Sequence, residues 1–180
     1  MALTSRLARR EDVPALLPLI AAAIDELQKG FLDDAQITAS RSIMGIDTQL
    51  IDDGTYFVVE LDEQVAGCGG WSRRATLYGG DHSSGRDPAL LDPRRDPAKV
   101  RAMYTHPLFA RRGIGRLILS LCEAAAGTEG FASLELMATL SGRALYEAAG
   151  FMPIEHVEDP VGGTLIPLIR MRKPILAAAS

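Results

Sequence analysis

Residues 99–126 have the sequence KVRAMYTHPLFARRGIGRLILSLCEAAA, and three structural signals follow one another within it. Val100–Thr105 is typical of a short strand that ends at a turn made by His106 and Pro107. Residues 110–115 form a glycine-containing loop with adjacent arginines. From this loop onward, apolar residues recur at the spacing of one helical face: Ile114, Leu117, Ile118, Leu121, Cys122 and Ala125. The predicted order is therefore strand, basic glycine loop, helix.

The junction between this loop and the helix suits an anion. The first amides of a helix have no intrahelical partner, and together with the macrodipole they attract negative charge. Gly113 and Gly115 lack a Cβ atom, so the backbone there is open to close approach. Guanidinium groups suited to phosphate oxygens come from Arg111, Arg112 and Arg116. The junction predicts a pyrophosphate site, and the alternative is a plain strand-to-helix turn with solvated arginines.

Several better-known site types are excluded. The chain has no Gly-x-x-x-x-Gly-Lys-Ser/Thr, and Ile118 stands where the dinucleotide fingerprint needs its third glycine. The three histidines are scattered and have no metal-ligand spacing, so no metal is predicted. A Ser-His-Asp hydrolase is unsupported because the chain has no Gly-x-Ser-x-Gly elbow.

The loop resembles the acyl-CoA-binding motif of the GNAT superfamily of N-acetyltransferases, which is written Gln/Arg-x-x-Gly-x-Gly/Ala. Gly113 and Gly115 occupy its glycine positions, and Arg112 is a typical neighbour. Ala110 stands where Gln or Arg is usual, with Arg111 one place later. Which arginine reaches the phosphates is therefore left open.

This resemblance implies that the donor is acetyl-CoA. The backbone of Met103, Tyr104 and Thr105 would hold the pantetheine arm like an added strand. The pyrophosphate would lie on the loop residues, which are Arg111, Arg112, Gly113, Ile114, Gly115 and Arg116. An amide of the splayed strand would stabilise the tetrahedral intermediate.

A second segment, residues 139–151 with the sequence TLSGRALYEAAGF, resembles the GNAT pattern Asn-x-x-Ala-x-x-Leu-Tyr-x-x-x-Gly-Phe. Thr139 replaces the Asn that contacts the pantetheine arm, and Gly142 replaces the Ala. By this resemblance Tyr146 is the general acid that protonates the CoA thiolate, since a phenol titrates near ~10. Without the resemblance, the expected role of Tyr146 is packing, with its hydroxyl bonded to backbone.

The whole chain predicts the order β-α-α-β-β-β-α-β-α-β-β. The remaining strands are expected at Leu3–Leu7, Thr55–Leu61, Val65–Trp71, Ala132–Met137, Met152–Glu158 and Thr164–Lys173, and the remaining helices at 12–30 (capped by Asp12), 34–44, 47–51 and 141–150 (capped by Ser141). This order is similar to the GNAT fold. The predicted class is α/β (α+β), with a central mixed, mostly antiparallel twisted sheet of about six to seven strands and about four flanking helices.

Some residues carry sharper structural predictions. Gly67, Gly69 and Gly70 indicate a bulge or the close approach of another backbone. Trp71 is expected to fill the core rather than line a cleft. Pro167 cannot donate to a ladder, so its strand is expected at a sheet edge or with a bulge. Residues 73–98 are rich in turn signals and predict a long surface loop, either a lid over the acceptor site or surface filler, with His82 solvated.

Length and composition bear on the number of domains, the class of partner and the cellular location. A chain of 180 residues is expected to form one domain, residues 1–180. The net charge of −4 gives no hint of nucleic-acid binding. Cys68 and Cys122 are expected as core thiols. The sequence has neither a long apolar run nor a signal-peptide layout, so we expect a cytoplasmic protein that does not span a membrane.

The predicted function is transfer of an acetyl group from acetyl-CoA to the primary amine of a small molecule. The alternatives are a non-catalytic acyl-CoA-binding or sensing domain, and a protein or peptide N-acetyltransferase. Transfer to a hydroxyl and transfer of a longer acyl chain also stay open. Glu60, Glu135, Tyr104 and His106 are conceivable bases for the amine, and no spacing singles one out. A homodimer is expected only because it is frequent in families of this kind.

Overall fold

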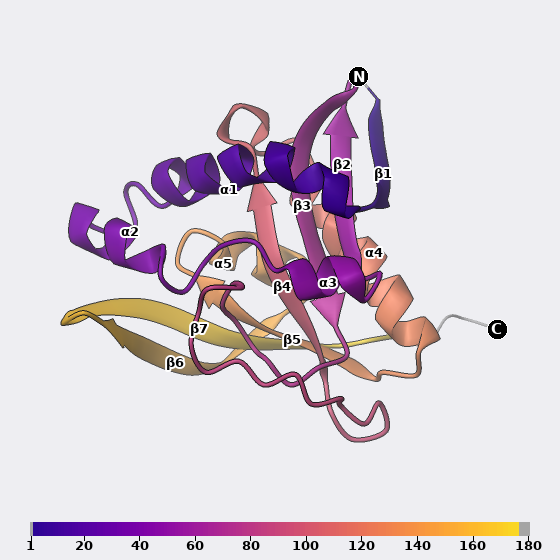
Figure 1. Cartoon of the computed structure of the whole chain (residues 1–180). Coiled ribbons are helices and arrows are strands. Elements are labelled where there is room, and N and C mark those ends of the chain that lie inside the picture. Colours follow the sequence, from indigo (N-terminus) through magenta and orange to yellow (C-terminus); the bar gives the residue numbers. More distant parts are fainter. Residues whose placement is uncertain (1, 177–180) are drawn as a thin grey trace.

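The computed structural model describes residues 2–176, which form one mixed sheet with helices on both faces (Figure 1). The sheet has seven strands in the order β1-β2-β3-β4-β5-β7-β6. The strands are β1 (Leu3–Leu7), β2 (Tyr56–Leu61), β3 (Gln64–Ser72), β4 (Ala98–Thr105), β5 (Ser133–Thr139), β6 (Met152–Val161) and β7 (Thr164–Pro174). The described residues form five α-helices: α1 (Val13–Leu27), α2 (Asp34–Ser40), α3 (Thr48–Asp52), α4 (Ile114–Thr128) and α5 (Arg143–Ala148). The predicted class is confirmed, and the element order differs from the prediction by one helix, because three helices rather than two precede β2.

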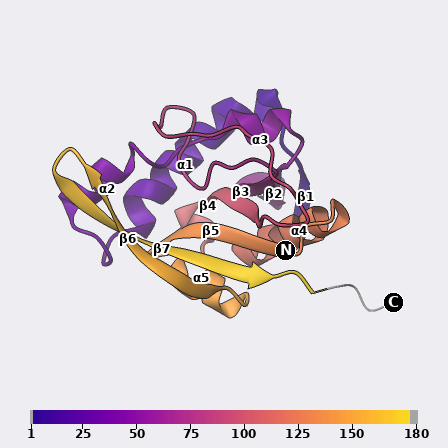
Figure 2. The same ribbon diagram turned by 90° about the horizontal axis from the view of Figure 1, so that it is seen from below.

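The sheet separates two cores. Helices α1 and α3 cover one face, and α4 and α5 cover the other (Figures 1 and 2). Successive residues of a strand point to opposite faces; Val58 of β2 accordingly packs with α1, and Val59 packs with α4. Trp71 is 1% exposed, and its ring meets that of Phe131 edge-on at 5.9 Å, so its predicted core role is confirmed.

Both predicted helix caps are wrong. The Asp12 carboxylate accepts a hydrogen bond from the Arg9 amide at 2.7 Å and pairs with Arg6, because a short 3₁₀ turn precedes α1. Before α5, the Gly142 amide donates to the Thr139 hydroxyl at 3.2 Å, whereas the Ser141 side chain caps no amide of the helix. In both places the carboxylate or hydroxyl that the sequence offered as a cap has another partner.

The glycines of β3 face a bulge in β4, as the sequence predicted. Cys68 pairs with Tyr104 and Gly70 pairs with Arg101, so two residues of β4 oppose the single residue between them in β3. The first of these two, Ala102, has a φ of 53°, in the left-handed region that L-residues rarely adopt. The hydroxyl of Tyr56 donates a 2.6 Å hydrogen bond to the Ala102 carbonyl and so stabilises the bulge.

The bulge accompanies the divergence of β4 from β5. These two parallel strands pair only at Ala98 with Leu134 and at Lys99 with Glu135. Beyond Lys99 the β5 side of β4 has no paired strand among the described residues. The sheet therefore opens at its centre, and this opening positions the site described below.

The strand of Pro167 was predicted to lie at a sheet edge or to carry a bulge. It is not an edge strand, and the irregularity in its ladder with β6 adds the extra residue to β6, between Pro153 and Glu155. Its strand, β7, lies between β5 and β6. Pro167 pairs with Glu158 of β6, while the ladder to β5 ends one residue later in the chain, at Leu168 with Thr139. At the proline itself β7 thus has a strand on one side only, which makes the missing N–H tolerable.

Gly70→Ala is expected to destabilise the fold by about 2 kcal/mol or more, because overpacking a rigid site forces the backbone to shift. A Cβ atom at Gly70 would lie 2.2 Å from the Thr55 carbonyl oxygen. The matched control is Gly54→Ala, where φ is +73° but no atom lies within 4 Å of the new Cβ; it should cost only about 1 kcal/mol. Denaturant unfolding measures both losses, and equal losses would contradict the close approach.

Candidate active site

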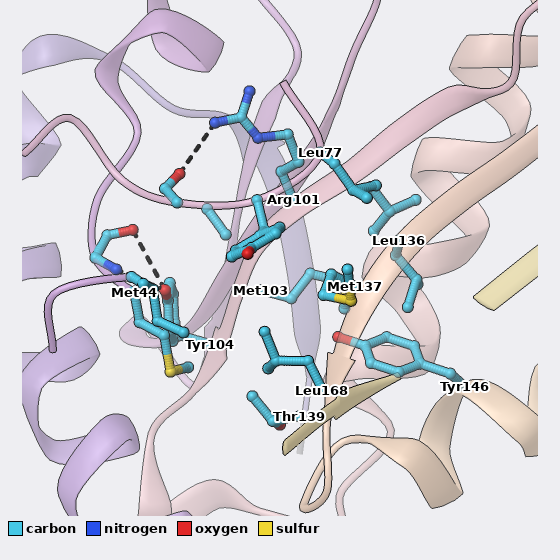
Figure 3. A pocket seen from close by; sticks show the side chains of 16 residues that line it. Met44, Leu77, Arg101, Met103, Tyr104, Leu136, Met137, Thr139, Tyr146 and Leu168 are labelled. Atoms are coloured by element: carbon cyan, nitrogen blue, oxygen red, sulfur yellow. Dashed lines mark hydrogen bonds between the residues drawn. The ribbon is translucent and has the colours of Figure 1, made fainter. Parts of the chain in front are cut away.

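A cavity of about 90 Å³ lies where β4 and β5 diverge (Figure 3). Strands β4, β5 and β7 form one part of its wall, and two segments, 43–45 and 77–79, form another. Its lining is largely apolar and includes Met44, Leu77, Met103, Leu136, Met137 and Leu168. A few polar side chains also line the cavity, and they are the candidates for its chemistry.

Tyr146 of α5 lines the cavity. Its ring packs edge-on against Phe151 with centroids 5.9 Å apart, and its hydroxyl is directed into the cavity toward Met137 (Figure 3). Among the described residues this hydroxyl has no hydrogen-bond partner, so the bond to backbone considered above does not form. Burial, with a smaller effect of the nearby Cys122, raises the pKa of Tyr146 to about 12. The phenol is therefore protonated and available at neutral pH.

The β4 residues predicted to hold pantetheine are arranged in two ways. Met103 and Tyr104 line the cavity, whereas Thr105 pairs with Gly67 of β3 outside the lining. The Tyr104 hydroxyl accepts a 2.8 Å hydrogen bond from the Gly45 amide, so this side chain is committed to the α1 side of the sheet. At these positions β4 presents its backbone N–H and C=O groups toward β5.

The predicted phosphate loop lies at the start of α4. Arg111 and Gly113 have φ values of 62° and 83°, and no side chain caps the helix at Gly113. A Cβ atom at Gly113 would meet nothing within 4 Å, so this glycine is needed for its φ and leaves open space. A Cβ atom at Gly115 would lie 2.6 Å from Leu145, so that glycine lets α4 pack against α5. Open space beside uncapped helix amides is suited to an anion.

Apart from Thr105, the predicted site residues fall into two groups. Met103, Tyr104, Thr139 and Tyr146 surround the cavity. The second group forms the start of α4 and consists of Arg111, Arg112, Gly113, Ile114, Gly115 and Arg116. All three arginines of this group are exposed, and the Arg112 guanidinium lies 5.7 Å from the centroid of the Phe109 ring. The contact between Gly115 and Leu145 joins the two groups through α5.

Three of the four conceivable bases lie outside the cavity lining, and the fourth, Tyr104, lines it with its hydroxyl bonded to Gly45. Glu60 pairs with Arg6, the Tyr104 hydroxyl is bonded to Gly45, and the His106 ring accepts from the Leu108 amide. Glu135 is buried in an ion cluster; although burial alone would raise its pKa, hydrogen bonds from Arg172 and the charge of Lys99 lower it.

The sequence missed two residues that line the cavity, each with a distant partner. Tyr78 lines the cavity, and its hydroxyl donates to Asp159 of β6 at 2.7 Å. Arg101 lines it from β4, and its guanidinium contacts the buried carboxylate of Asp47. The partners are far apart in the sequence, so no local spacing could have indicated these pairs.

The loop expected at 73–98 ends at residue 97, because Ala98 already belongs to β4. Its segment 77–79 lines the cavity, so the loop is more than surface filler. It is held to the segment before α3 by several contacts. Asp81 accepts from the Thr48 amide, Ser83 donates to the Ser42 carbonyl, and the exposed His82 ring contacts the Arg41 carbonyl at 2.6 Å.

Residues 52–153, more than half of the chain, match the family model for an acetyltransferase (GNAT) domain. The chain belongs to the GNAT acetyltransferase family. It is accordingly an acyltransferase, and the resemblance drawn from its two motifs is confirmed. No curated protein sequence matches this GNAT domain closely enough to be informative.

Solved structures share its fold. A GCN5-related N-acetyltransferase from Rhodopseudomonas palustris is 18% identical with a TM-score of 0.67, over 96% of this chain and 94% of that one. The putative acetyltransferase yncA from Salmonella typhimurium, solved with its cofactor acetyl-CoA, is 19% identical with a TM-score of 0.63, over 100% and 98%. The ribosomal-protein-S18-alanine N-acetyltransferase from Escherichia coli is 18% identical with a TM-score of 0.60, over 99% and 97%.

Two further properties concern only the residues that the structure describes. They contain no group of three or more His, Cys, Asp or Glu side chains that could hold a metal ion. Within the same range, no helix is both long enough and apolar enough to cross a membrane.

The tyrosines of this GNAT domain are expected to ionise only well above pH 10. Burial is the main cause that raises the pKa of all four, namely Tyr56, Tyr78, Tyr104 and Tyr146, and the values for Tyr78 and Tyr146 are about 12. Unfolded tyrosines titrate near ~10. Tyrosinate absorbance of the folded protein should therefore appear about two pH units later than that of the denatured protein.

The same shifts predict the pH dependence of stability. Because the folded-state pKa values are raised, their contribution to stability is complete below about pH 10 and is lost as the pH rises toward about 12. Tyrosinate absorbance at pH 10 in protein that is still folded would contradict the burial of these side chains.

Proposed function

We propose that this GNAT domain transfers an acetyl group from acetyl-CoA to the primary amine of a small molecule. The observation that carries the proposal is the cavity between the diverging strands β4 and β5, into which the Tyr146 hydroxyl is directed. The cavity is small and walled by segments 43–45 and 77–79, which favours a small acceptor over a folded protein.

In this proposal the donor is held along β4 and over α4. The backbone of Met103–Thr105 hydrogen-bonds the pantetheine arm, because β5 does not occupy that side of the strand. The uncapped amides at the start of α4 bind the pyrophosphate, with guanidinium groups of the loop arginines beside them. Thr139, the last residue of β5, lines the cavity and contacts the same arm. The relative from Salmonella typhimurium, which was solved with acetyl-CoA, supports this choice of donor.

The chemistry is a direct transfer. The neutral amine nitrogen attacks the thioester carbonyl carbon and forms the C–N bond, and the C–S bond then breaks. Tyr146 gives its proton to the departing sulfur and regains one from solvent. The amine enters mostly as its ammonium form and, before the attack, gives one proton to Asp159 through the Tyr78 hydroxyl; after the C–N bond has formed, the nitrogen loses a second proton to solvent. The products are the N-acetylated amine and free CoA.

Two other functions remain as candidates. Transfer to a protein or peptide amine is supported by the relative from Escherichia coli, whose printed name makes it a ribosomal-protein-alanine N-acetyltransferase. A non-catalytic acyl-CoA-binding domain would keep the α4 site and need no Tyr146.

The buried, unpaired Cys68 and Cys122 are compatible with a reducing setting such as the cytoplasm.

Gly113→Val should weaken CoA binding by about tenfold or more, since a β-branched residue is strained at this φ and the loop must rearrange. Calorimetric titration of the purified protein with CoA measures the change. Gly54→Val is the matched control, because it introduces the same strain at an open site outside the proposed binding residues. Equal CoA affinity in all three proteins would exclude this loop as the phosphate site.

Tyr146→Phe should lower kcat by about a hundredfold or more while CoA affinity stays close to that of the wild type, because the phenol acts only on the leaving thiolate. Release of free thiol with a panel of primary amines measures turnover. A domain that only binds acyl-CoA would show no turnover to lose, and unchanged turnover in the variant would remove Tyr146 from the mechanism.

Tyr78→Phe provides a comparison with a different pH dependence. It interrupts the path to Asp159, so its rate should fall most near pH 7, where a free alkylamine is almost wholly charged. Its deficit should shrink toward pH 10, where the amine loses its proton without help. A deficit that stays constant with pH would indicate that Tyr78 only holds its loop in place.

A further inference from the structure

Arg101 is a buried arginine on the wall of the cavity. It lies in β4 next to the bulge residue Ala102, and its side chain is 1% exposed. One guanidinium nitrogen, Nη2, contacts the Asp47 carboxylate and donates to the Gly79 carbonyl at 3.0 Å. The other two, Nε and Nη1, are buried and have no hydrogen-bond partner among the described residues. Buried charged donors normally have partners, so these two nitrogens indicate a missing acceptor.

The charges around Arg101 are also unbalanced, with more positive groups than negative ones. The fully buried carboxylate of Asp47 is shared by two guanidinium groups, those of Arg101 and Arg86, the second at 2.9 Å. Asp81 is the next carboxylate, but it is exposed and already accepts from the amide and hydroxyl of Thr48. The interior therefore holds one more positive charge than negative, and a buried charge without a counter-charge is unfavourable. An anion bound here would correct the imbalance.

Arg101 lies at the end of the cavity where the proposed function places the acceptor. Figure 3 shows Arg101 at one end of the cavity and Tyr146 and Thr139 at the other. In the proposed function the second end receives the thioester, so the first end receives the acceptor. Between them the wall is apolar, with Leu77, Met103 and Leu136.

We propose that the acceptor carries a carboxylate that accepts a hydrogen bond from one of the free donors of Arg101, Nε or Nη1, and that the acceptor is an apolar amino acid. This inference rests on the proposed function and names its substrate class. The Nε–H and Nη1–H groups point to different sides of the guanidinium, so the carboxylate accepts one charge-assisted hydrogen bond, from either of them. The Gly79 carbonyl accepts from Nη2, so Nε and Nη1 are the donors left for the carboxylate. The apolar wall then accommodates the amino acid side chain.

The inference separates the two acceptor classes left open above. A free amino acid has a carboxylate on the carbon that bears its amine. At the N-terminus of a peptide or protein the same position holds a neutral amide. Only the free amino acid can neutralise Arg101, so a protein N-terminus should be a poor acceptor.

The test uses leucine, valine and phenylalanine, each compared with its amide and with the amine left by removing its carboxyl group. Thiol release from acetyl-CoA measures kcat/KM, and calorimetry measures binding of each compound to the CoA-loaded protein. At least one amino acid should exceed both of its partners by about tenfold or more, the effect of one charge-assisted hydrogen-bonded contact.

Arg101→Gln should remove this preference, with a loss of about tenfold or more for the amino acid and little loss for its decarboxylated amine. Arg86→Gln is the matched control. Arg86 also pairs with Asp47, but both of its terminal nitrogens are already bonded, to Asp47 and to the Gly79 carbonyl. The preference should therefore persist in Arg86→Gln. If Arg101→Gln fails to fold, Arg101→Lys keeps the charge without the Nε and Nη1 donors and should show a reduced preference.

The outcomes distinguish this inference from the proposed function. Acetylation of the amides and decarboxylated amines as efficiently as the amino acids overturns the carboxylate site and leaves the acetyltransferase intact. Absence of turnover with every amine, in a protein that binds acetyl-CoA, counts against the proposed function. In that case binding of an amino acid that Arg101→Gln abolishes still supports the carboxylate site, and absence of such binding overturns it.

Discussion

The hydrogen bond from Tyr56 to the Ala102 carbonyl supports the feature on which the site depends, the bulge in β4. A left-handed alanine is unfavourable by about 1–2 kcal/mol and persists only where the surroundings hold it. The glycines of β3 make room for the extra residue, since a Cβ atom at Gly69 would lie 2.7 Å from the Met103 side chain. Without the bulge β4 could continue to pair with β5, and the central opening of the sheet would close.

Two buried ion clusters lie on either side of this opening. At the closed end, Lys99 and Glu135 are register partners and form a 3.2 Å ion pair, which Arg172 of β7 extends. At the open end, Asp47 brings Arg101 and Arg86 together. The first cluster has a carboxylate with several cations around it at the point where strands pair. The second cluster leaves the Nε and Nη1 donors of Arg101 without a partner, where β4 and β5 separate. The same residue types are thus structural at one end and available to a ligand at the other.

Local patterns predicted most of the architecture. The α4 face, the β2–β3 hairpin and the core role of Trp71 depend on residues close in sequence, and so does the loop before α4. The failures involve distant partners. Asp12 was expected to cap a helix but pairs with Arg6. The strand of Pro167 was expected at a sheet edge or with a bulge, but it lies inside the sheet, with Pro167 just beyond the end of the β5 ladder. Tyr78–Asp159 and Arg101–Asp47 join segments that only the folded sheet brings together, so no spacing in the sequence could have indicated them.

Strand β4 also explains how one short segment can serve two substrates. Toward β5 it presents backbone groups without a partner strand, which suits the amide-rich arm of a cofactor. Regular alternation would place Val100 and Tyr104, four residues apart, on one face; the extra residue of the bulge puts Val100 in the core under α4 and Tyr104 in the core under α1. Arg101 stands directly before the bulge, where the backbone leaves its regular course, and its guanidinium is brought to segments 45–47 and 77–79. The distortion that opens the donor side of the strand therefore also places a cation on the acceptor side.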